Sequence, residues 1–127
     1  MSWLYEQATG HLITPAGEVL SPPGYSGAFG IWLNNPIYQN VKDKGCIPEG
    51  WYTRGEPVAM DVKTGRYSIP LTPDAENEMF GRDDFRMHGD SILEPGHASE
   101  GCIIQTFEVR KQFGESPDSL LHVVPGY

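Results

Sequence analysis

The segment FRMHGDSILEPGHASEGCII, which spans residues 85–104, holds the pattern that decides the fold: a strand, a loop and a second strand. Side chains alternate between the two faces of a strand, so Arg86 and His88 are expected on one face and the apolar residues between them in the core. Gly89 breaks the strand directly after His88, which puts the imidazole at the rim of a sheet. Functional sites are commonly built beside such loops.

The loop from Asp90 to Glu100 is expected to arch over the surface, because it holds a Pro-Gly turn and few large apolar residues. It returns through Gly101 to Cys102, after which two isoleucines re-enter the core. A glycine directly before a nucleophile permits a tight turn and leaves backbone N–H groups pointing outward, where they can stabilise an oxyanion. The candidate donors are the N–H groups of Glu100, Gly101 and Cys102.

His88 and Cys102 are the candidate catalytic pair. A free thiol has a pKa of about 8.5, and a nearby imidazole that accepts its proton makes it nucleophilic. Ser99 could hydrogen-bond the imidazole or shape the turn. Gly89 and Asp90 are supporting candidates, because the Gly89 carbonyl could fix the imidazole tautomer. The assignment of this pair depends on the combination of H-G-D, a Pro-Gly loop and S-x-G-C.

The whole chain is expected to be one mainly β domain over residues 1–127, since this length suits a single domain. Fifteen Gly and 11 Pro argue against long helices. Two short helices are expected, one over 34–41 and one over 106–113, with Thr106 as its cap and Gly114 just past its end. Strand candidates separated by turns predict a compact sandwich or barrel. Those strand candidates are 3–7, 11–14, 19–20, 51–53, 58–62, 67–71, 85–88 and 120–124.

The charge of the chain excludes several classes of partner. The net charge is −8, and the nine Lys and Arg form no basic stripe, so nucleic-acid binding is not expected. No stretch approaches the roughly 18 apolar residues of a membrane span, so no membrane insertion is expected. The N-terminal MSWLYEQATG lacks the features of a signal peptide, which predicts synthesis in the cytoplasm without a cleavable signal. No cofactor or metal is expected.

The spacing from His88 to Ser-x-Gly-Cys102 resembles the YkuD-type L,D-transpeptidase motif. The chain as a whole resembles the family of type VI secretion L,D-transpeptidase effectors from about residue 2 to 124. The segments that carry this resemblance are WLYEQATGHL (3–12), GYSG (24–27), NNP (34–36), GCIPEG (45–50), IPLTP (69–73), FRMHGD (85–90) and ASEGCI (98–103).

The resemblance implies a YkuD-like fold and an antibacterial toxin, which a type VI apparatus delivers into the periplasm of a neighbouring cell. It implies action on peptidoglycan stem peptides, as an L,D-carboxypeptidase that removes D-alanine from tetrapeptides or as a transpeptidase that exchanges it for another D-amino acid. It also implies a periplasmic immunity protein in the producer. The motif carries over His88 as base, Ser99 as supporting residue and Cys102 as the nucleophile that forms a thioester.

The chain departs from the YkuD pattern on both sides of the cysteine. Glu100 stands where many such enzymes have His, and it would oppose thiolate formation unless its side chain turns away. The usual Arg and Asn after the cysteine are missing, so the substrate carboxylate lacks its usual ligand. Arg86, on the same face as His88, and Arg82 are the predicted substitutes.

Two other kinds of protein stay open. His88, Asp90, His97 and Cys102 could in principle ligate zinc in a zinc-dependent peptidase. A non-enzymatic β-rich binding module with an incidental cysteine is the second alternative. Papain-like and NlpC/P60-type layouts place Cys before His, and no motif-bearing His follows Cys102.

Overall fold

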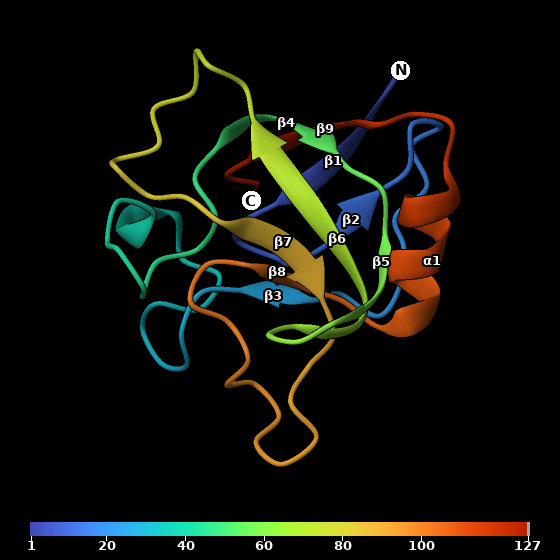
Figure 1. Cartoon of the computed structure of the whole chain (residues 1–127). Helices are drawn as coiled ribbons and strands as arrows, with labels where there is room; N and C mark the ends of the chain where they lie inside the picture. Colours follow the sequence, from blue (N-terminus) through green and yellow to red (C-terminus); the bar gives the residue numbers. More distant parts are fainter. Residues whose placement is uncertain (127) are drawn as a thin grey trace.

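The computed structural model describes residues 1–126, and in that range it has nine strands, one α-helix and one 3-10 turn (Figure 1). The helix α1 spans Phe107–Glu115, and the 3-10 turn η1 spans Pro36–Tyr38. The strands are β1 (Ser2–Glu6), β2 (Leu12–Ile13), β3 (Tyr25–Ser26), β4 (Gly50–Arg54), β5 (Val58–Asp61), β6 (Gly65–Pro73), β7 (Phe85–His88), β8 (Ile103–Ile104) and β9 (Leu120–Val124). The prediction of a mainly β fold is confirmed.

The strands form one curled sheet in the order β2-β1-β9-β4-β6-β7-β8-β3, and β5 pairs with β6 beside this path. The pairs β1–β9 and β7–β8 are parallel, and the other pairs are antiparallel. The two ends of the path approach each other where the Gly24 N–H donates to the Gly10 carbonyl at 2.8 Å. The sheet therefore wraps around its own apolar face.

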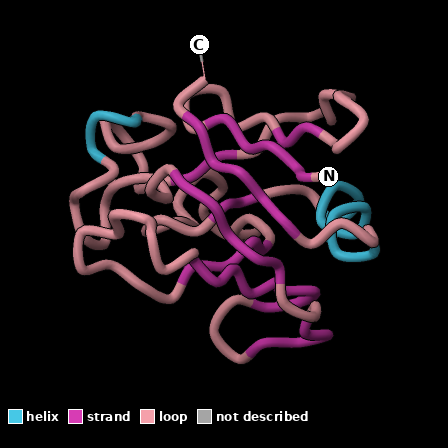
Figure 2. The backbone as a smooth tube through the Cα atoms, turned by 90° about the horizontal axis from the view of Figure 1, so that it is seen from above, coloured by secondary structure: helices cyan, strands magenta, loops and turns pink. Residues whose placement is uncertain are grey.

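The core forms because the inward-facing positions of the strands carry large apolar side chains. In β1, Trp3 and Tyr5 are buried and alternate with less buried neighbours. Phe113 of α1 packs edge-on against Trp3, with ring centroids 5.3 Å apart, so the helix closes one side of the sheet. Figure 2 shows α1 and η1 at opposite sides of the molecule. Neither is long and apolar enough to cross a membrane.

The first predicted helix is shorter than expected. The segment 34–41 forms only η1, whose hydrogen bonds join residues three apart, as in Gln39 N–H to the Pro36 carbonyl at 3.2 Å. The predicted start is nevertheless present, since the Asn35 side chain accepts the Ile37 N–H at 3.1 Å. No residue of η1 is buried, so no apolar face packs against the sheet to stabilise a full helix.

The second predicted helix begins where expected but runs further. Thr106 caps α1, because its hydroxyl accepts the Val109 N–H at 3.3 Å. The helix continues through Gly114 and ends at Glu115. A Cβ on Gly114 would lie 2.5 Å from the Tyr67 hydroxyl, so this glycine permits close packing of the helix and does not terminate it.

The parallel pairing of β7 and β8 places the functional segment. Met87 is opposite Ile103 and His88 is opposite Ile104, so Cys102 lies at the position beside Arg86. Because the strands are parallel, the connecting loop must run back along the sheet, and it projects well away from the body in Figure 1. Cys102 and His88 are therefore diagonal neighbours across the β7–β8 pair.

Candidate active site

His88 and Cys102 line one cavity of about 330 Å³ beside β7 and β8. Much of the remaining lining is charged, which the sequence did not predict. These charged residues come from three further segments of the chain, and they include Lys42, Asp43, Lys63, Asp83 and Asp84. The cavity is therefore suited to a small polar substrate that carries charges of both signs.

The Cys102 thiol is partly buried, directly before the start of β8. Its sulfur lies 3.8 Å from the Asp84 carbonyl oxygen. Burial raises the pKa of this thiol, and the Asp84 carboxylate adds to the rise, while the Arg86 N–H and the charges of Arg86 and Lys63 oppose it. Glu100 is exposed, so the carboxylate that acts on the thiol is Asp84 and not the residue that the sequence pointed to.

The His88 imidazole is buried, with 6% of its surface exposed. Its Nδ1 lies 3.0 Å from the Gly89 carbonyl oxygen, as the sequence led us to expect. A carbonyl only accepts, so Nδ1 carries the proton and Nε2 keeps a free lone pair. Burial lowers the pKa of His88, and the nearby Arg110 and Arg86 charges lower it further. The imidazole is therefore neutral near pH 7 and can accept a proton at Nε2.

Ser99 shapes the turn before the cysteine. Its buried hydroxyl donates to the Cys102 carbonyl at 2.6 Å and accepts the N–H groups of Gly27 at 2.9 Å and of Gly101 at 3.0 Å. Of the two roles expected for Ser99, these contacts correspond to the second. The Gly101 N–H is occupied by this hydroxyl, so the oxyanion donors that remain are the N–H groups of Glu100 and Cys102.

The backbone conformation and the close packing at position 101 require a glycine. Its φ is +139°, and a Cβ there would lie 2.5 Å from Arg82 Nη2 and 3.0 Å from the Phe85 ring. A side chain at this position would push the turn away from the sheet. The glycine of the S-x-G-C pattern thus sets how closely Cys102 approaches β7.

Arg82 is buried and binds backbone carbonyls. Its Nη1 donates to the carbonyls of Gln39 and Cys46, and its Nη2 donates to those of Gly45 at 2.9 Å and Glu100 at 3.1 Å. The guanidinium therefore fastens the segment 39–46 to the turn before the nucleophile. Since both terminal nitrogens are used in this way, Arg82 has no pair of N–H groups left for a substrate carboxylate.

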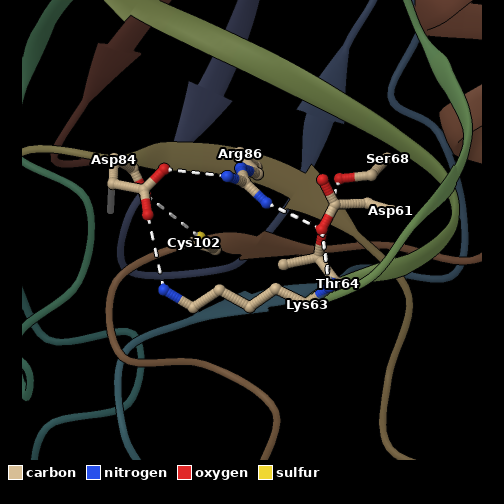
Figure 3. A network of polar contacts seen from close by, with 7 residues as sticks. All are labelled: Asp61, Lys63, Thr64, Ser68, Asp84, Arg86 and Cys102. Carbon is tan, nitrogen blue, oxygen red and sulfur yellow. Dashed lines mark hydrogen bonds and ion pairs between the residues drawn. The ribbon is translucent and has the colours of Figure 1, made fainter.

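Arg86 lies in a network of four charged side chains beside Cys102 (Figure 3). Its Nη1 is 3.0 Å from Asp61 Oδ1, and its Nη2 is 3.2 Å from Asp84 Oδ1. The other oxygen of Asp84 lies 3.4 Å from Lys63 Nζ. Two carboxylates therefore compensate the Arg86 charge, which favours a structural role over direct binding of an anion.

Asp90 holds the loop that follows His88. It accepts the Tyr25 hydroxyl at 2.6 Å and the Gly96 N–H at 3.1 Å, and the Tyr25 oxygen accepts the Ala98 N–H at 3.0 Å. Tyr25 was not predicted from the sequence as part of the site, because only the pairing of β3 with β8 brings it to this loop. Asp84 and Lys63 were not predicted either, because they belong to no sequence motif.

The zinc-peptidase alternative requires His88, Asp90, His97 and Cys102 to share one metal ion. In the structure, two of these residues contact other partners. His97 stacks on Phe29 at 4.2 Å between ring centroids, and Asp90 bonds to Tyr25. Within residues 1–126, no three His, Cys, Asp or Glu side chains are grouped so that they could hold one metal ion.

Comparison with known proteins gives one match. A family model described as the Tlde1 domain matches residues 21–122, about four fifths of the chain. This range includes His88, Ser99 and Cys102, and also Lys63, Asp84 and Arg86. Neither the curated proteins nor the solved structures include a match to the chain.

Proposed function

Because this chain belongs to the Tlde1 domain family, whose members are type VI secretion effectors of L,D-transpeptidase type, we propose that it is an antibacterial cysteine enzyme of the cell wall. Its substrate is the tetrapeptide stem of peptidoglycan. It removes the terminal D-alanine as an L,D-carboxypeptidase, or exchanges it for another D-amino acid as an L,D-transpeptidase. The observation that carries this proposal is that His88, with Nε2 free, and Cys102 line the same cavity.

In the first step, His88 Nε2 takes the proton of the Cys102 thiol, and the sulfur attacks the carbonyl carbon on the L-centre of diaminopimelate. The N–H groups of Glu100 and Cys102 stabilise the oxyanion of the tetrahedral intermediate. The intermediate collapses to a thioester, and the amine of D-alanine leaves with the proton from His88.

In the second step, His88 removes a proton from water or from the amine of an incoming D-amino acid. The oxygen or nitrogen attacks the thioester carbonyl, and the Cys102 sulfur leaves and regains the proton. Water gives the tripeptide stem, and a D-amino acid gives an exchanged tetrapeptide.

The resting state of this pair is uncharged. The pKa of the Cys102 thiol is raised and that of the His88 imidazole is lowered, so a thiolate–imidazolium pair is disfavoured before substrate binds. The proton moves as the sulfur attacks, which is general-base catalysis. This resting state also limits side reactions of the thiol during transfer between cells.

The decisive experiment is digestion of tetrapeptide-rich peptidoglycan, with the products identified by mass. The wild type is expected to give tripeptide stems, and exchanged stems when a D-amino acid is added. Cys102→Ala and His88→Ala are expected to give neither, while Cys46→Ala, which removes the buried thiol, stays active. Full activity of Cys102→Ala refutes the proposal. Loss with a chelator but not with a thiol alkylator supports the zinc-peptidase alternative, and no product from the wild type supports the binding module.

The same proposal applies to cells. Directed to the periplasm, the wild type is expected to be toxic and Cys102→Ala is not. Co-production of the periplasmic immunity protein of the producer is expected to restore growth. Delivery by the type VI apparatus is tested by competition between a producer with the apparatus and one without it.

A further inference from the structure

The cavity is lined by four Lys and Arg side chains that could bind a substrate carboxylate, and their partners differ. Arg82 donates to four backbone carbonyls. Arg86 lies between the carboxylates of Asp61 and Asp84. The two lysines, Lys42 and Lys63, are left as the cations that can turn to an incoming anion.

Lys63 is on the side of the cavity where the reaction takes place. Its ammonium lies 3.4 Å from Asp84 Oδ2, and the carbonyl of the same Asp84 lies 3.8 Å from the Cys102 sulfur. Figure 3 shows the lysine reaching toward Asp84 beside Cys102. The Lys63 side chain is 73% exposed and that of Asp84 is 50% exposed, and an exposed pair of this kind is weak. A second carboxylate can therefore displace Asp84 from the ammonium.

The tip of the hairpin between β5 and β6 carries Lys63, and Arg86 holds it in place. The Asp61 carboxylate accepts the N–H groups of Lys63 at 2.8 Å and Thr64 at 2.9 Å. Arg86 of β7 binds that same carboxylate oxygen at 3.0 Å and reaches the Thr64 hydroxyl at 3.3 Å. The strand that bears His88 thus fixes the turn that presents the lysine.

We propose that Lys63 binds the free carboxylate of the D-amino acid at the scissile end of the stem peptide. Asp84 holds the ammonium in the free enzyme, and Asp61 and Arg86 are positioning residues that keep the hairpin tip over Cys102. The lysine then takes the place of the arginine that is missing after the cysteine. This inference rests on the proposed function and names the residue that determines its specificity.

The test compares a soluble tetrapeptide stem with a free C-terminal carboxylate and the same peptide as its C-terminal amide. The wild type is expected to prefer the acid. Lys63→Met is expected to lower kcat/KM for the acid about tenfold more than kcat/KM for the amide, mainly through KM, because a charge-assisted hydrogen bond to the carboxylate is lost. Lys63→Arg is expected to restore the preference. Lys111→Met, an exposed lysine on α1, is the matched control.

The positioning role has its own readout. Asp61→Asn keeps Lys63 but weakens the turn, so KM for the acid is expected to rise less than in Lys63→Met, and to rise more than KM for the amide. An equal effect of Asp61→Asn on both peptides overturns this part.

The possible results distinguish a failure of the Lys63 assignment from a failure of the proposed function. A wild type that turns over neither peptide overturns the proposed function and the inference together. Turnover with an acid preference that survives Lys63→Met overturns the inference alone. Loss of the preference in Lys42→Met, with Lys63→Met unchanged, assigns the carboxylate to the other lysine and also overturns it.

Discussion

Replacement of Ser99 by alanine is the sharpest test of how the turn before Cys102 is built. The hydroxyl is 3% exposed and makes three hydrogen bonds, two of which satisfy the buried N–H groups of Gly27 and Gly101. A buried donor left without a partner costs about 1–3 kcal/mol. With two such donors, Ser99→Ala is expected to lower the free energy of unfolding by roughly 2–6 kcal/mol.

The assay is urea denaturation at pH 7, followed by tryptophan fluorescence, together with stem-peptide turnover. Turnover is expected to fall in Ser99→Ala even where the protein is folded, because the Gly101 N–H is released and the Cys102 backbone loses its support. Ser91→Ala is the control, since that hydroxyl accepts one exposed N–H, from Glu94. A change under about 0.5 kcal/mol in Ser99→Ala, equal to that of an ordinary surface substitution, refutes the reasoning.

Three further predictions concern the same site. Gly101→Ala is expected to destabilise the fold by about 2 kcal/mol or more, since φ is +139° and the Cβ would meet Arg82; an unchanged urea midpoint contradicts this. Iodoacetamide is expected to label Cys102 far faster than Cys46, which is 0% exposed and whose pKa burial raises to about 11; peptide mapping that shows equal rates counts against an accessible thiol at Cys102. Because burial lowers the pKa of His88, the unfolded chain takes up a proton near pH 6.5 that the folded chain does not, so stability is expected to fall as pH drops below about 6.5. Urea titrations at pH 7.5 and 5.5 are expected to show a smaller fall in His88→Gln than in the wild type, and equal falls would contradict this.

Local patterns predicted the elements that depend on neighbouring residues. The bounds of β7 and β9 agree with the alternation and apolar runs seen in the sequence, because a strand needs only side chains that suit its two faces. Thr106 caps α1 as expected, since a cap acts within one turn of its own helix. Where tertiary packing decides the outcome, as at η1 and Gly114, the local pattern predicted the wrong length.

The features of the candidate site also fall into those that local sequence predicts and those that depend on tertiary structure. The sequence by itself determined that His88 ends a strand at Gly89 and that Cys102 follows a tight glycine turn, because both depend on adjacent residues. Only the tertiary structure decided which of the charged residues compensate one another around them. The parallel pairing of β7 with β8 puts Cys102 beside Asp84 and Arg86, and the hairpin between β5 and β6 brings Lys63 to the same place. Charges act through space, so residues far apart in the chain set the chemistry of the thiol, and no local pattern records which of them will meet.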